Sequence, residues 1–215
     1  MKALNTYIIE KFQVAKDNIK AYKYYPETKE ELIQCIKEKI EQEGLGTKDK
    51  PLDLNDIDTS MITDMSKLFD SAESLIELSE NGNFDISEWD VSNVTDMMYM
   101  FYGSSFDGDI SNWDVSNVKN MDFMFYYCKF DGDISNWDVS NVKDMRNMFG
   151  FSWFTGKNGD ISKWNVSNVE IMYRMFCGSH FNGNIDDWAI NDDTNTNQMF
   201  ERCPFLKNTP KWYKE

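Results

Sequence analysis

The 215-residue chain is 41% hydrophobic and 15% aromatic, enough to bury a core, and its formal net charge is -15. Residues 1–50 carry 10 basic and 9 acidic side chains, so nearly all of the negative charge falls after residue 50. An acidic surface repels phosphate backbones, which argues against nucleic acid as a partner. No run approaches the ~18 apolar residues that cross a bilayer, so we expect no membrane insertion.

The first twelve residues do not have the continuous apolar core and small-residue cleavage site of a signal peptide. The four cysteines form no CxxC pair, which favours a reducing compartment or simple indifference to redox. They are Cys35, Cys128, Cys177 and Cys203. We therefore expect a cytoplasmic or virion-associated protein, whereas a leader removed before residue 1 would favour the cell surface.

Residues 1–50 do not repeat, and we expect them to form an N-terminal helical cap. A first helix is indicated by apolar residues at helical spacing, namely Leu4, Ile8 and Phe12. A capping box from Thr28 to Glu31 opens a second helix, which we expect to end at Gly44. Its apolar face comprises Leu32, Ile33, Ile36 and Ile40. We interpret this region as a shield for the first repeat, with a docking or assembly module as the alternative.

Residues 53–215 form a tandem repeat. Four clear copies begin with Asp-Ile-Ser and share the pattern WxVSNV followed by MxxMF; they start at Asp85, Asp109, Asp133 and Asp160. Their tryptophans recur every 24 residues, except for one step of 27 that contains an insertion at 157–159. Degenerate copies at 57–69 and 188–200 flank them, and Trp212 opens a partial copy. We therefore predict about six coils and a C-terminal partial coil.

Each repeat predicts one strand and one helix. Asp-Gly or Asn-Gly turns precede an alternating segment, 86–91 in the first clear copy, which favours a strand. Asn93 is then an expected helix N-cap, with Asp96 at its third position. Equivalent N-caps are Asn117, Asn141 and Asn168. The predicted fold class is thus an α/β repeat solenoid, similar to leucine-rich repeats, with one short strand and one short helix per ~24-residue coil.

The motifs WDVSNV, MxxMF and FxGDIS resemble those of the BspA-like leucine-rich-repeat family. Tandem units of this family occur in bacterial surface proteins and mycoplasma lipoproteins. The similarity covers about residues 53–200, over which several fixed positions recur in the same order. The resemblance implies an α/β solenoid that serves in adhesion or protein binding.

Nothing in the sequence favours catalysis or a cofactor. The GxSxG, HExxH, P-loop and Rossmann patterns do not occur. His180 is the only histidine, and its repeat position elsewhere holds Ser105, Lys129 and Trp153, so we expect a loop residue. Asp-Gly turns recur at Asp107 and Asp131, where stacked carboxylates could hold Ca²⁺. The GGxGxD pattern of calcium-binding repeats is missing, so we favour solvated turns.

Variable positions of the repeat are the candidate binding surface. Counted from each tryptophan, positions +9, +10, +13, +14 and +16 vary. Their aromatic residues are Tyr99, Tyr102, Phe123, Tyr126, Tyr127, Phe151, Trp153 and Tyr173. Tyrosine and tryptophan are favoured interface anchors, although these rings could instead pack between neighbouring helices.

This pattern predicts a non-catalytic protein-binding or adhesion scaffold. A structural or assembly component, virion-associated or self-associating, is one alternative, and the separate N-terminal segment favours it. A carbohydrate-binding module is another, because exposed aromatic rings stack on sugars. The expected partner is a protein, with a glycan second, and the oligomeric state is left open.

Overall fold

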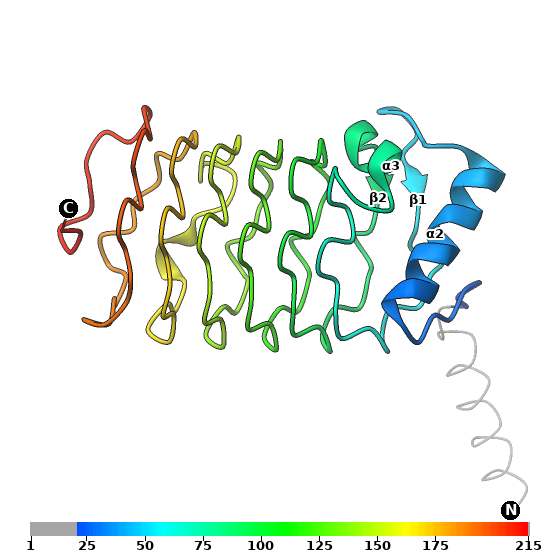
Figure 1. Ribbon diagram of the computed structural model, residues 1–215, viewed down its shortest axis with the longest axis horizontal. Helices are drawn as coiled ribbons and strands as arrows, with labels where there is room; N and C mark the ends of the chain where they lie inside the picture. Colours follow the sequence, from blue (N-terminus) through cyan, green and yellow to red (C-terminus); the bar gives the residue numbers. More distant parts are fainter. Residues whose placement is uncertain (1–20, 215) are drawn as a thin grey trace, which may run out of the picture.

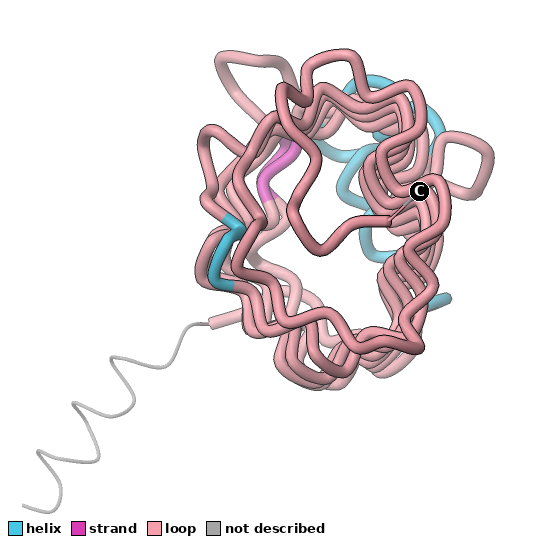
Figure 2. Tube along the Cα trace, turned by 90° about the vertical axis from the view of Figure 1, so that its left-hand side faces the viewer, coloured by secondary structure: helices cyan, strands magenta, loops and turns pink. Residues whose placement is uncertain are grey.

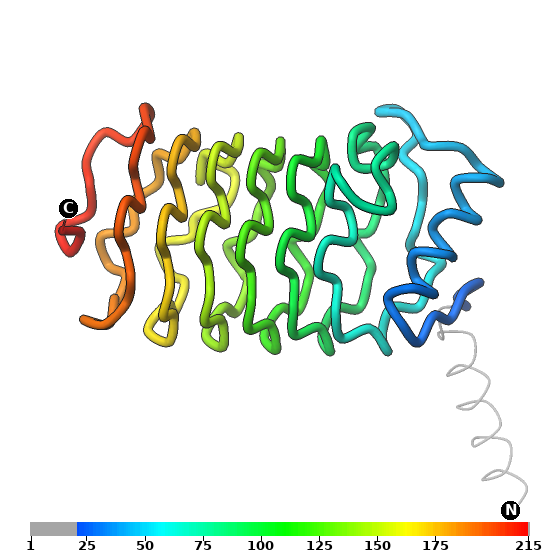
Figure 3. Tube along the Cα trace, in the orientation of Figure 1, coloured from blue at the N-terminus to red at the C-terminus, as the bar shows by residue number. Residues whose placement is uncertain are grey.

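The computed structural model describes residues 21–214, so the helix expected from Leu4, Ile8 and Phe12 lies outside the described residues. Successive repeats stack along one axis (Figure 1), with α2 at one end and the C-terminus at the other. Figure 3 traces each repeat as a loop of similar outline. Within residues 21–214 no helix has the length and apolar character needed to span a membrane.

The predicted α/β solenoid of strand–helix units is wrong. The described residues contain helices α2 (Lys29–Glu43) and α3 (Ile76–Asn81), strands β1 (Leu52–Asp53) and β2 (Phe84–Asp85), and a 3-10 turn at Ile161–Lys163. β1 and β2 pair in parallel, with Leu52 opposite Phe84 and Asp53 opposite Asp85. The repeats themselves consist almost entirely of turns and irregular backbone, drawn as loops in Figure 2.

The segments expected as helices do not form them because individual residues in each segment adopt left-handed dihedrals. Tyr99 and Phe123 have φ of 57° and 54°, in the left-handed region, whereas an α-helix needs right-handed dihedrals throughout. Their amides bond to the next repeat instead of to residue i−4. The Tyr99 amide, for example, donates to the Asp122 carbonyl at 2.9 Å. We call these stretches the ladder segments: residues 64–71, 96–103, 120–127, 144–151, 171–178 and 195–202.

The segments expected as strands bend around the core. Alternation placed Ile86 and Trp89 on opposite faces, yet both are buried, as is Val91. The chain turns between them, since the Trp89 amide donates to the Ile86 carbonyl at 3.1 Å. The expected N-cap asparagines also act differently, because each side-chain amide spans two repeats. That of Asn93 donates to the Ser60 carbonyl at 2.8 Å.

Aromatic side chains stack in columns through the interior, among them the repeat tryptophans and the phenylalanines of MxxMF. The indole of each of the six tryptophans that set the repeat period donates to a carbonyl of the preceding repeat at 2.8–3.1 Å; the acceptors are Leu54, Ile86, Ile110, Ile134, Ile161 and Ile185. The phenylalanines of MxxMF stack 5.4–5.8 Å apart, in the order Phe69, Phe101, Phe125, Phe149, Phe176 and Phe200. The fixed residues of the repeat are thus its core, because each copy completes its neighbour.

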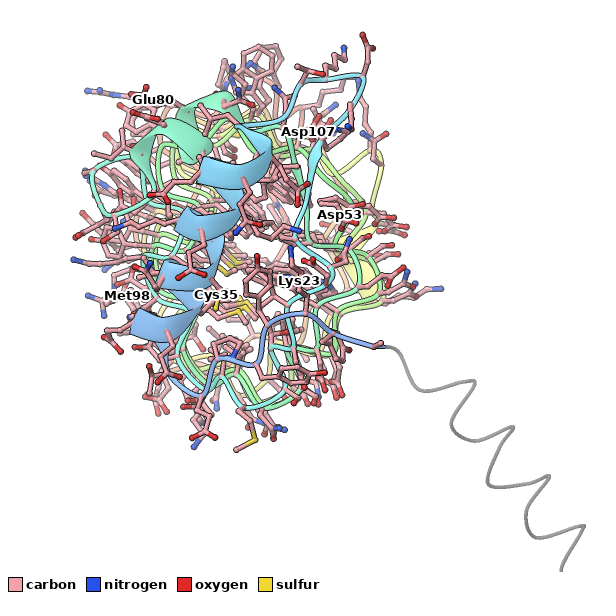
Figure 4. The ribbon with its side chains drawn as sticks, turned by 90° about the vertical axis from the view of Figure 1, so that its right-hand side faces the viewer. Lys23, Cys35, Asp53, Glu80, Met98 and Asp107 are labelled. Atoms are coloured by element: carbon pink, nitrogen blue, oxygen red, sulfur yellow. The ribbon has the colours of Figure 1, made fainter. Side chains whose placement is uncertain are left out.

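Helix α2 covers the first repeat, as Figure 4 shows from that end. It begins at the predicted cap, where the Thr28 hydroxyl accepts from the Glu31 amide at 3.2 Å, and it ends at Gly44. Leu32 and Ile36 are fully buried. Lys29 adds an ion pair of 2.7 Å to Asp64 of the first ladder segment.

Candidate partner-binding surface

Six of the eight predicted aromatic residues form one continuous surface. The rings come from neighbouring ladder segments, and rings of one repeat pack against rings of the next. We call this surface the aromatic face; it comprises Tyr99, Tyr102, Phe123, Tyr126, Tyr127 and Phe151. The centroids of Tyr99 and Phe123 lie 4.7 Å apart in a stacked pair. Tyr102 stacks on Tyr126 at 5.3 Å, and Tyr127 stacks on Phe151 at 5.0 Å. Edge-on and tilted contacts join these pairs.

The aromatic face is partly buried by its own rings and partly open to solvent. Tyr127 is 55% exposed, and the other five rings are half-buried. The alternative prediction, that these rings pack between neighbouring helices, therefore holds only for the buried part of each ring. The segments they pack against consist of turns and not of helices. Two glycines make room for the rings, because a Cβ at Gly150 or Gly178 would lie 2.7 Å from the Tyr126 ring or 2.5 Å from the Phe151 ring.

Left-handed backbone supports part of this surface. Tyr99, Phe123, Tyr127 and Phe151 have φ between 51° and 57°, which is uncommon for aromatic residues. Polar residues at equivalent positions of other repeats, such as Asn147, share this conformation. The geometry therefore belongs to the ladder segments, and it determines where any side chain at these positions points.

Trp153 and Tyr173 lie apart from the aromatic face. Trp153 is 58% exposed, and its ring centroid is 6.0 Å from that of His180, which stacks on Phe205 at 4.7 Å. The Tyr173 hydroxyl donates to the Gln198 side-chain oxygen at 2.9 Å. The ring contacts of His180 and Phe205 were not predicted, although the shared +16 position of Trp153 and His180 was a usable signal.

A buried carboxylate lies beside the aromatic face. Asp122 is 9% exposed, and its Oδ1 accepts no hydrogen bond from the described residues. Arg146 Nε is 3.7 Å from this atom, too far for a hydrogen bond, and donates instead to Asp144 at 3.0 Å. Burial, with repulsion from Asp144 and Asp96, raises the pKa of Asp122 to about 7 despite the opposing charge of Arg146.

The acidic turns lie elsewhere and bind the backbone of the next repeat. Asp107 Oδ1 accepts from the Asp131 amide at 3.0 Å, and Asp131 Oδ1 accepts from the Thr155 amide at 2.7 Å. Asp107 lies on the opposite side of the stack from Met98, which occupies the +9 position next to Tyr99 (Figure 4). Across residues 21–214 no group of three potential metal ligands comes together.

Comparison with known proteins gave one family. A family model described as a Mycoplasma protein of unknown function, DUF285, matches residues 42–157 and again residues 127–213. The two matches overlap within the tandem repeats and together extend over residues 42–213. No curated protein and no solved structure matches the chain.

Proposed function

The chain belongs to the DUF285 family, a Mycoplasma family of unknown function, and we propose that it is a non-catalytic protein-binding module that uses the aromatic face. The observation that carries this proposal is the continuous chain of ring contacts from Tyr99 to Phe151, with Tyr127 open to solvent. Aromatic side chains bury large areas and dominate interface energetics. The resemblance to BspA-like leucine-rich repeats supports protein binding or adhesion as the role.

The rigidity of the aromatic face favours binding. Its backbone is held from both sides, because ladder segments donate to the next repeat and accept from the previous one. Its rings are held by each other and by the close approach at Gly150 and Gly178. Side chains that are already ordered lose little entropy when a partner binds, so more of the contact energy contributes to affinity.

The proposal is tested with variants that keep the left-handed backbone intact. Asparagine occupies that conformation at Asn147, so Tyr127→Asn with Phe151→Asn removes two rings at little backbone cost. Trp153→Asn is the matched control, because it removes an equally exposed ring outside the aromatic face. Partners are captured by cross-linking in cell extract, identified by mass spectrometry, purified, and titrated against each variant by calorimetry.

We expect the double variant to weaken binding of the purified partner by at least about tenfold, or ~1.4 kcal/mol, and the control by less than about twofold. Equal weakening by both variants would contradict the proposal. So would a glycan array on which the chain binds sugars through Trp153, or sedimentation showing that the captured partner is a second copy of this chain. Unchanged melting curves are required of both variants.

A further inference from the structure

The backbone beneath the aromatic face has no free hydrogen-bonding group. In the three ladder segments that carry the face, every amide after the first residue donates within the stack, and every carbonyl except the last accepts within it. These segments are 96–103, 120–127 and 144–151. A partner therefore cannot add to this surface by backbone pairing, as a strand adds to the edge of a sheet. The three segments have further repeats on both sides, so their exposure does not depend on where the chain begins or ends.

Free tyrosine hydroxyls supply the polar groups of the aromatic face. None of the four forms a hydrogen bond with another residue of 21–214; they belong to Tyr99, Tyr102, Tyr126 and Tyr127. The Tyr173 hydroxyl, outside the face, is already bonded to Gln198. Burial is the main cause that raises the pKa of Tyr99 and Tyr126, so these hydroxyls keep their protons and can donate.

The repeat spacing matches that of a polyproline II helix. The bridges between these ladder segments are parallel, so neighbouring repeats lie about 4.8 Å apart. The stacked rings agree, since Tyr102 and Tyr126 are 5.3 Å apart and Tyr127 and Phe151 are 5.0 Å apart. Positions two repeats apart are thus separated by about 10 Å, and one polyproline II turn of three residues advances about 9.3 Å. Such a helix along the stack would place every third residue over every second repeat.

Proline also suits the chemistry of this surface. It has no amide N–H, so it can cover apolar ring surface without burying an unpaired donor, which costs free energy. The carbonyls of a polyproline II helix have no internal hydrogen bonds, so they are free to accept from the tyrosine hydroxyls. An extended segment of other residues would instead bury its amides against backbone that has no carbonyl left to accept them.

Carboxyl groups border the aromatic face beside Tyr99. Asp96 and Asp144 both repel Asp122. Among the described residues, Arg146 is the one cation that offsets this repulsion, and it already donates to Asp144 at 3.0 Å. Negative charge is therefore in excess at this edge, which favours a basic residue in the partner.

Building on the proposed function, we propose that the partner of the aromatic face is a proline-rich segment in the polyproline II conformation, with prolines three residues apart and a basic residue at one end. Its prolines pack on rings of 96–103 and 144–151, and its carbonyls accept from the tyrosine hydroxyls. The basic residue faces the carboxyl groups beside Tyr99. A second copy of this chain does not fit, because none of its four prolines are three residues apart; they are Pro26, Pro51, Pro204 and Pro210.

The probe is a fluorescent peptide of one arginine followed by nine prolines, titrated against the full chain by anisotropy. We expect saturable binding with a Kd below about 0.5 mM. A peptide of one arginine followed by nine alternating glycines and serines should bind at least about tenfold more weakly, because it is not ordered and carries amide donors. Replacing the arginine of the proline peptide with glutamate should weaken binding at least about threefold.

Tyr102→Phe with Tyr126→Phe removes two hydroxyls and keeps both rings. This double variant should bind the proline peptide at least about fivefold more weakly than the unmodified chain. Tyr173→Phe is the matched control, because its hydroxyl lies outside the face and is already bonded. Its affinity should stay within about 1.5-fold of the unmodified chain, and the melting curves of all three proteins should coincide.

The proposal is overturned by a lack of saturation at about 1 mM proline peptide, by equal binding of the glycine-serine peptide, or by equal weakening in Tyr173→Phe and the double variant. The proposed function is tested separately, with the captured partner and the Tyr127→Asn and Phe151→Asn variant. If that variant loses a captured partner that has no proline-rich segment, the proposed function stands and this inference fails.

Discussion

Replacing Asp122 with asparagine should stabilise the fold at alkaline pH and do so less at acidic pH. The carboxylate is buried, and its Oδ1 accepts no hydrogen bond within residues 21–214. Its pKa is raised from 3.8 to about 7 in the folded protein. Between these values the folded state holds a proton that the unfolded state has released, so stability falls as the pH rises through this window. Above the pKa of Asp122 in the folded state, the full destabilisation from its buried charge is present.

The magnitude follows from the size of the shift. A rise of about three pKa units, which already includes the opposing charge of Arg146, corresponds to ~4 kcal/mol at most, and residual solvent access reduces it to about 2–4 kcal/mol. Asparagine keeps the shape of the side chain and has no charge to bury. The difference in unfolding free energy between variant and unmodified chain should therefore shrink by about 2–4 kcal/mol from pH ~8 to pH ~4.

Urea titrations followed by tryptophan fluorescence at the two pH values measure this difference. Asp114→Asn is the control, because Asp114 is exposed in the same repeat and makes a turn bond to the Ser116 amide at 3.1 Å. Its effect should stay within about 0.5 kcal/mol at both pH values. A difference for Asp122→Asn that is the same at both pH values, or larger at acidic pH, would refute the reasoning.

Three further predictions concern the core and the thiols. Trp137→Phe leaves the buried Ile110 carbonyl without its indole donor, so we expect a loss of about 1–3 kcal/mol in urea unfolding; an unchanged midpoint would contradict a role for that bond. Gly178→Ala should cost more than about 1 kcal/mol, because φ is 66° and its Cβ would meet the Phe151 ring; thermal melting measures this, and no loss would contradict it. Burial raises the pKa of the Cys128 thiol to about 12, so it should react with Ellman's reagent only after unfolding; rapid reaction in the native chain would contradict that burial.

The sequence predicted the tandem organisation because the fixed residues are also the core. The tryptophan period located every indole that bonds to the preceding repeat, and the capping box located the start of α2. The local conformation could not be obtained in the same way. Met97, Met100 and Phe101 have the spacing of a helix face, but the same spacing arises from turns in which the Met100 amide donates to the Met97 carbonyl.

The candidate surface was only partly predictable for a related reason. Variation between repeats identified the aromatic positions, but which rings touch depends on left-handed residues and on glycines in the neighbouring repeat. Tyr127 and Phe151 stack because both lie at the +14 position, whereas Trp153 at +16 joins His180 instead. Asp122 Oδ1 accepts no hydrogen bond among the described residues because Arg146 of the next repeat donates to Asp144 of its own repeat, an arrangement that cannot be read from one repeat alone.

Side-chain footprinting of the chain with its captured partner tests the proposed binding surface most directly. Hydroxyl radicals oxidise exposed aromatic rings, so Tyr127 and Trp153 should both react in the free chain. In the complex we predict that oxidation of Tyr127 and Phe151 falls while that of Trp153 stays as it was. Protection of Trp153 with Tyr127 still reactive would contradict the assignment of the aromatic face as the binding surface.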